Sequence, residues 1–305
     1  MKKVVFKPDS DLERYAFDTI ERRLDDKPRA KKMWELITQD SEIKACWQMA
    51  NFVAVHKLGM NDHGETHAVV ATASALTMLD LLTGTGVRPD VIAENYGDED
   101  DAALIILSAM LCHDLGTMVH REDHSSLGVS FALPILDRLL SEIYDHPEKR
   151  TIIRSFILSA IYTHHGTPRP ITIEGALVCI GDSTDMTKGR GRATFDAGSI
   201  TIHTVSALSI ERVEIRRGTT KPIELRILMS NSAGIFQVQE ILAPKVRAGP
   251  LANVVDVIAV TVGGSDQNEE KIVQGIRMEG TRFVPWNDRA GNPDKLPGIS
   301  AGTLE

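Results

Sequence analysis

The chain has 305 residues, of which 42% are hydrophobic and 25% are charged, as in an ordinary soluble globular protein. Its formal net charge of −8 argues against binding to a nucleic-acid duplex or to an anionic membrane, and no apolar run reaches the roughly 18 residues that cross a bilayer. The three cysteines lie far apart within apolar helical patterns and form no CxxC pair. We therefore expect core thiols in a reducing compartment, and a cytoplasmic protein.

Helical patterns fill the chain up to about residue 187. Caps and breaks divide this part into amphipathic and apolar segments, and no internal repeat is visible. The predicted helices span 9–24, 29–39, 41–58, 65–82, 90–95, 102–114, 122–144, 147–162 and 173–184. The helix over 102–114 ends at His113 and Asp114, and we expect Gly116 to follow in the left-handed conformation that closes many helices.

The pattern changes beyond about residue 205. Residues 212–217 and 222–229 alternate apolar and polar side chains around a glycine-containing turn, which predicts a hairpin. A helix over 231–246 and a β-branched strand over 254–262 follow. The predicted fold class is mainly α: an all-α domain over 1–190 with its core at 60–190, a small α+β domain (β-β-α-β) over 205–280, and a flexible tail over 281–305.

Nine of the ten histidines lie before residue 166. Several stand at the ends or in the first turns of predicted helices, where side chains can converge on one cavity. A histidine beside an aspartate supplies half of a coordination shell for a divalent transition metal, although the same pair could simply cap a core helix. The candidate ligands are His67, His113, Asp114, His124, His164, His165 and Asp182.

The order of these residues resembles the H…HD…D pattern of the HD-domain superfamily of metal-dependent phosphohydrolases. One helix opens at His67 (HAVVATA), an apolar helix ends in HDLG at His113, and another apolar helix reaches Asp182 (ALVCIGD). The resemblance covers about residues 60–190. It implies an all-α HD-domain helical bundle in which His67, His113, Asp114 and Asp182 bind one metal ion.

The remaining histidines resemble those of the binuclear branch, which includes the HD-GYP phosphodiesterases. By this resemblance Asp114 would bridge two ions, with His124, His164 and His165 holding the second. No Gly-Tyr-Pro follows His165, and Thr117 replaces the lysine often found after HDxG, so a cyclic-di-GMP activity is not expected. Imidazoles and carboxylates without thiolates suit Mn²⁺, Fe²⁺, Ni²⁺ or Zn²⁺.

A phosphorylated substrate also needs cationic groups. A glycine-rich stretch after Asp182 carries lysine and arginine. A guanidinium group can donate two parallel hydrogen bonds to two oxygens of one phosphate group. The same stretch could be a solvated basic linker, and Arg121 could equally pair with Glu122 or Asp123. The candidate phosphate-binding residues are Lys188, Arg190, Arg192 and Arg121.

The candidate catalytic residues are Asp114, His120 and His63. The two histidines could act as outer-sphere donors or general acids, or could be plain loop residues. Three neighbouring carboxylates, Asp62, Glu65 and Asp185, could orient the ligand histidines, as in many metal sites. For Asp62 and Glu65, helix-cap roles are favoured.

The sequence therefore predicts a phosphohydrolase that uses metal-activated water on a phosphomonoester or phosphodiester. The expected partner is a small phosphorylated substrate such as a nucleotide, and a homodimer is left open. Two alternatives remain: a di-iron oxygenase built on the HD fold, and a nucleotide sensor without catalytic activity.

Overall fold

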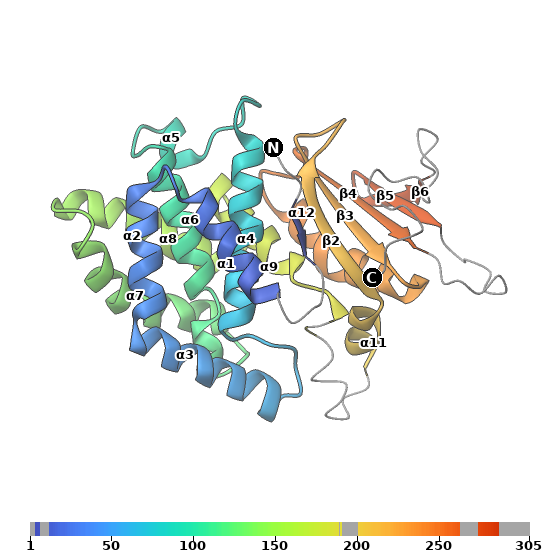
Figure 1. Cartoon of the computed structure of the whole chain (residues 1–305), viewed down its shortest axis with the longest axis horizontal. Coiled ribbons are helices and arrows are strands. Elements are labelled where there is room, and N and C mark those ends of the chain that lie inside the picture. The colour runs from blue at the N-terminus through green and yellow to red at the C-terminus, as the bar shows by residue number, and fades with distance from the viewer. Residues whose placement is uncertain (1–3, 7–11, 189, 191–200, 263–273, 287–305) are drawn as a thin grey trace.

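A bundle of helices and a six-stranded sheet lie side by side in the computed structural model of the chain (Figure 1). The structure describes residues 4–6, 12–188, 190, 201–262 and 274–286. Helices occupy the first part of the chain, and all strands but the first lie in the second part. The mainly α character predicted from the sequence is confirmed.

The helical bundle follows the predicted segments closely. A π-helical stretch, Phe52–Lys57, continues the third helix, and a 3₁₀ turn, Leu115–Met118, follows the sixth. The helices are α1 (Leu12–Arg23), α2 (Pro28–Gln39), α3 (Ser41–Asn51), α4 (Glu65–Leu82), α5 (Asp90–Ala93), α6 (Glu99–Cys112), α7 (His124–Ser141), α8 (Pro147–Thr163) and α9 (Ile173–Thr184).

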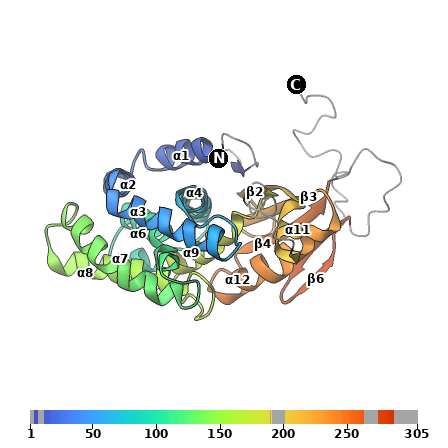
Figure 2. The same cartoon turned by 90° about the horizontal axis from the view of Figure 1, so that it is seen from below.

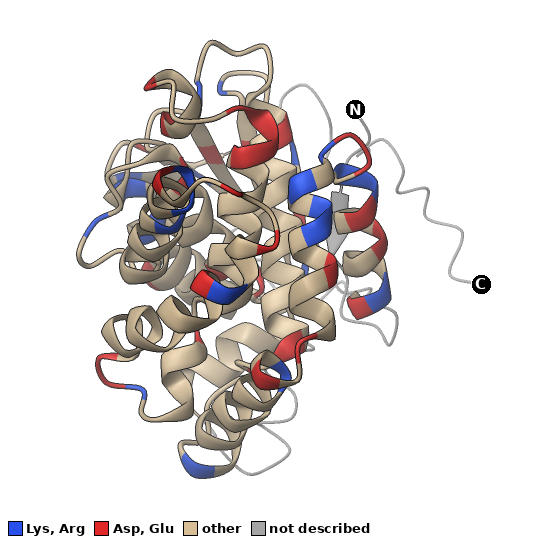
Figure 3. Ribbon diagram, turned by 90° about the vertical axis from the view of Figure 1, so that its left-hand side faces the viewer, with Lys and Arg blue, Asp and Glu red and all other residues tan. Residues whose placement is uncertain are grey.

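Two long helices, α4 and α6, form the interior of the bundle. Helix α4 is seen nearly end-on in Figure 2 and packs against α1, α6 and α9. All residues from Asp100 to Cys112 in α6 are buried, because this helix is apolar on every side. The helices in the middle of Figure 3 accordingly carry few charges, which gather at helix ends and on outer helices. The segment Glu99–Met118 is long and apolar enough to cross a bilayer, but 94% of its apolar window is buried, as in the core helix of a soluble protein.

The sheet contains the predicted β-β-α-β unit and exceeds it. The hairpin and the later strand are present, and the last two strands of the unit are parallel. The predicted helix over 231–246 is divided into a 3₁₀ turn (Ser232–Gly234), a π-helical stretch (Gln237–Leu242) and α12 (Ala243–Ala248). A further helix, α11 (Ile202–Leu208), precedes the hairpin. In sheet order the strands are β1 (Val4–Phe6), β2 (Ile210–Arg217), β3 (Ile223–Met229), β4 (Val255–Thr261), β5 (Gly275–Glu279) and β6 (Arg282–Pro285).

Three of these strands were not predicted. Strand β1 pairs with β2 in the register Val4↔Ile215, which joins the start of the chain to the sheet. Strands β5 and β6 form a second hairpin, and β6 lies within the segment expected to be a tail. Such short strands depend on hydrogen bonds to partners distant in sequence, so local periodicity does not reveal them.

Gly116 adopts a different conformation from the one predicted. It lies within the 3₁₀ turn and not in the left-handed region. A Cβ at this position would lie 2.0 Å from the carbonyl oxygen of His124 and 2.5 Å from the nitrogen of Gly128. The glycine is therefore needed for a close backbone approach that places the start of α7 against the end of α6.

We predict that Gly116→Ala displaces the start of α7, because overpacking against backbone costs about 1–3 kcal/mol or more. The variant should unfold at lower urea concentration and should bind less metal, since α7 carries His124. Gly128→Ala is the matched control, because its Cβ would lie 3.2 Å from the nearest backbone oxygen. Equal stability and metal content in the two variants would contradict this role of Gly116.

Candidate metal centre

Six of the seven predicted ligands meet at one end of the helical bundle, whereas His165 is exposed and belongs to none of the close groups of ligand atoms found among the described residues. His67 lies in the first turn of α4, His113 and His164 are the C-cap residues of α6 and α8, and His124 opens α7. Asp182 lies in the last turn of α9. These four histidines are buried, and Asp114 is only 6% exposed. Groups of three ligand atoms lie within 4.8 Å of one another, among His67, His113, Asp114, His124, His164 and Asp182.

Each buried histidine is oriented by a hydrogen bond from Nδ1. His113, His124 and His164 each donate Nδ1–H to the carbonyl oxygen three residues earlier, at 2.6, 2.9 and 2.7 Å. In His67 the acceptor is the carboxylate of Asp185, at 2.7 Å. All four rings therefore direct Nε2 toward the centre of the site, the arrangement that prepares an imidazole for metal binding.

The first ligand cluster comprises His67, His113, Asp114 and Asp182. The Nε2 atoms of His67 and His113 are 3.2 Å apart. Asp182 Oδ1 lies 3.1 Å from His67 Nε2, and Asp114 Oδ2 lies 3.2 Å from His113 Nε2. Ligand atoms that are about 2.0–2.1 Å from one ion lie about 3 Å from one another. The donor set and its spacing thus fit a divalent transition metal.

The second ligand cluster lies on the other side of the Asp114 carboxylate. His124 Nε2 and His164 Nε2 are 3.0 Å apart. Asp114 Oδ1 lies 3.5 and 3.8 Å from these two nitrogens. The two oxygens of Asp114 therefore face different pairs of imidazoles.

The charges of the site stabilise one another. Burial opposes protonation of His113, but the carboxylates of Asp114 and Asp182 raise its pKa to about 10. Burial would raise the pKa of Asp114, yet the adjacent His113 holds it well below its usual range. Burial and the nearby Arg121 guanidinium lower the pKa of His124 to about 4, so this ring is neutral.

Arg121 lies against the second cluster. Its Nη1 is 3.0 Å from His124 Nε2 and 3.5 Å from Asp114 Oδ1, and its Nη2 is 2.8 Å from His165 Nε2. Neither of the pairings expected from the sequence, with Glu122 or with Asp123, is among its contacts in the described structure. The guanidinium instead donates to the Nε2 atoms of His124 and His165, which are candidate metal ligands.

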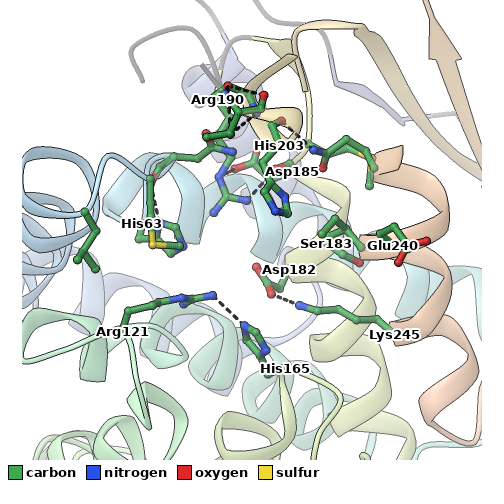
Figure 4. Close-up of a pocket in the computed structure, with 18 of the residues that line it drawn as sticks. His63, Arg121, His165, Asp182, Ser183, Asp185, Arg190, His203, Glu240 and Lys245 are labelled. Carbon is green, nitrogen blue, oxygen red and sulfur yellow. Dashed lines mark hydrogen bonds and ion pairs between the residues drawn. The ribbon is translucent and has the colours of Figure 1, made fainter. Parts of the chain in front are cut away.

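A cavity of about 530 Å³ opens beside the ligand clusters, between the helical bundle and α11 and α12 (Figure 4). Its wall includes three of the predicted catalytic or phosphate-binding residues, His63, Arg121 and Arg190. His63 is buried, and this burial lowers its pKa to about 3, so the ring is neutral and a weak proton acceptor. His120 is exposed, does not line the cavity, and accepts a hydrogen bond from the nitrogen of Glu122.

The predicted phosphate-binding stretch is only partly at the cavity. Arg190 lies in the wall, but its guanidinium donates to the carbonyl oxygens of Asp62 and Asp185. Lys188 does not line the cavity, and its ammonium pairs with Glu211 at 2.6 Å. Arg192 lies outside the described residues. Arg190 therefore positions the loop before α4 and the carboxylate that orients His67.

Sequence reasoning missed Lys245. This residue of α12 lines the cavity and forms an ion pair with Asp182 (Figure 4). No local pattern could indicate the contact, because the partners are 63 positions apart in the sequence.

Comparison with known proteins agrees with this geometry. A protein-family model described as HD domain matches residues 89–187, a range that contains His113, Asp114 and Asp182. The chain is 38% identical over 229 residues to the uncharacterized protein MJ1020 of Methanocaldococcus jannaschii. That similarity covers 75% of this chain and 88% of the relative. No solved structure matches the chain significantly.

We predict that metal uptake releases about one proton per chain at pH 7. His113 is protonated at this pH because its pKa is about 10, and it must lose the proton to become a ligand. The apparent affinity should rise about tenfold per pH unit between pH 6 and 9. Calorimetry of Mn²⁺ binding in buffers of different ionisation enthalpy measures the released protons. Heats independent of the buffer would contradict the prediction, and His146→Ala, which removes an exposed histidine, is the control.

Proposed function

Because the chain belongs to the same family as the Methanocaldococcus protein and carries an HD domain, we propose that it is a metal-dependent phosphohydrolase acting on phosphate esters of small molecules such as nucleotides. HD domains are generally metal-dependent hydrolases, and the residues of this site suit such a metal. The observation that carries the proposal is the position of Asp114, whose two oxygens face two separate pairs of imidazoles.

Two divalent ions would use all the ligand candidates. The first would be held by His67, His113, Asp114 and Asp182, and the second by Asp114, His124, His164 and His165. Divalent ions in such a pair lower the pKa of water toward about 7 and neutralise charge on a phosphate. His63, which is neutral and lines the cavity, donates Nδ1–H to the carbonyl oxygen of Asn61, so its Nε2 can accept a hydrogen bond from a substrate or a water molecule.

The charges around the cavity favour an anionic substrate. The wall combines three carboxylates with three cationic side chains: Asp182, Asp185, Glu240, Arg121, Arg190 and Lys245. With Asp114 behind the wall, the protein's own charges nearly cancel. Each divalent ion would add two positive charges, so the loaded site would attract a phosphate group.

The size of the cavity favours a small substrate. Its volume of about 530 Å³ falls within the range of about 300–1,000 Å³ that is typical for small-molecule sites. The wall also includes Thr201, Thr204 and Gln237, whose side chains are hydrogen-bonded within the protein. A nucleoside monophosphate or a molecule of similar size would satisfy these limits.

We predict that the Mn²⁺-loaded protein releases phosphate or a nucleotide from members of a phosphoester panel. Asp114→Asn should lose at least about 10³-fold in kcat/KM, because the bridging carboxylate is removed and about 4 kcal/mol of stabilisation is lost with it. Asp145→Asn, an exposed carboxyl away from the cavity, is the control. Binding of nucleotides without turnover by the fully loaded protein would instead identify a sensor. Oxygen consumption by the iron-loaded protein, without phosphate release, would identify an oxygenase.

We also predict that Arg121 weakens the second metal site in the absence of substrate. Its guanidinium and a metal ion compete for the Nε2 lone pairs of His124 and His165. Mn²⁺ titration should therefore resolve a tight and a weak site, and Arg121→Ala should tighten the weak site about tenfold or more. Arg169→Ala removes an exposed arginine near His165 and serves as the control. A second affinity that is unchanged or lower in Arg121→Ala would refute the competition.

A further inference from the structure

Lys245 is a buried cation beside the ligand clusters. Only 9% of the residue is exposed, which is unusual for lysine unless its ammonium is paired. The ammonium forms an ion pair with Asp182 Oδ2. Asp182 Oδ1, in contrast, faces His67 and His113. Lys245 therefore contacts the oxygen of Asp182 that is turned away from the histidines.

Helix α12 packs against the loop that follows His165. A Cβ on Gly166 would lie 3.8 Å from Lys245 Cγ, so the stem of the lysine lies against the loop that follows His165. Just beyond α12, a Cβ on Gly249 would lie only 2.9 Å from Pro170 Cγ. The sheet half of the protein (β1 and residues 201–262 and 274–286, including α11 and α12) is thus packed directly against the loop that follows His164 and His165.

Lys245 retains hydrogen-bond donors that can face a ligand. An ammonium has three donors, and within the described ranges the structure records one acceptor for it, Asp182 Oδ2. Lys245 also lines the cavity. Arg190, the other cation on this side, already donates to two backbone carbonyl groups. Arg190 thus uses three of its five N–H donors within the protein, whereas the lysine uses one of three.

We propose that Lys245 binds the phosphate group of the substrate, so that the sheet half completes the site formed by the helical bundle. This inference rests on the proposed phosphohydrolase function. Asp182 holds the ammonium at the edge of the ligand clusters, where its remaining N–H groups are available to a phosphate group in the cavity. Lys188, which the sequence suggested for such a role, is engaged with Glu211 instead.

The test uses the full-length protein loaded with Mn²⁺ and inorganic phosphate as the probe in a calorimetric titration. Lys245→Met, which keeps the aliphatic stem, should raise the Kd for phosphate about 10- to 150-fold, the loss expected for one charge-assisted hydrogen bond. Lys245→Gln keeps a hydrogen bond to Asp182 without the charge and should also bind phosphate weakly. Arg247→Ala, on the same helix but donating to Thr281, should bind phosphate as the parent does.

The outcomes separate this inference from the proposed function. If Lys245 only neutralises Asp182, both variants will change the melting temperature or Mn²⁺ affinity but leave the Kd for phosphate unaltered, and the inference is overturned. In that case hydrolysis by the parent protein would leave the proposed function intact. A parent protein that neither binds phosphate nor hydrolyses any ester would overturn both. Parallel losses of phosphate affinity in folded, Mn²⁺-loaded Lys245→Met and Lys245→Gln would support the assignment.

Discussion

The metal centre depends on one repeated interaction, in which a buried imidazole gives its Nδ1–H to a fixed acceptor. Two of these histidines cap the ends of α6 and α8, where backbone carbonyl oxygens lack partners within the helix. The same hydrogen bond satisfies a helix end and turns Nε2 inward. The Nε2 atoms of His67 and His113, and those of His124 and His164, lie about 3 Å apart, so their lone pairs repel unless a proton or a metal ion lies between them. Leaving such a buried acceptor unpaired costs about 1–3 kcal/mol. The fold therefore favours cation binding at this point.

The site is also a junction between the two halves of the protein. Helix α9 supplies Asp182, α12 supplies Lys245, and Arg190 connects the end of α9 to the loop before α4. A movement of the sheet half relative to the bundle would consequently shift the charges around the cavity. Strand β1 further joins the start of the chain to β2, so the two halves are connected at both ends of the helical segment.

Much of the fold and the ligand set could be predicted from the sequence, because both depend on local pattern. Apolar periodicity predicted the helix ranges. The candidate ligands lie at helix ends in the H…HD…D order of the HD-domain superfamily. Contacts between distant segments could not be predicted in this way. The partner of Asp182 lies in α12, the reason for Gly116 is the backbone of His124, and β1 is defined only by its pairing with β2. Arg190 has the charge expected of a phosphate ligand, but only its three-dimensional position reveals that carbonyl oxygens already occupy three of its five donors.

The central claim is that Asp114 separates two metal positions, each completed by its own pair of imidazoles. Anomalous diffraction from crystals grown with saturating Mn²⁺ tests this claim most directly, because it locates the ions without reference to activity. The account predicts two anomalous peaks about 3.5–4 Å apart, one on each side of the Asp114 carboxylate. A single peak at the first cluster, or none within reach of Asp114, would contradict it.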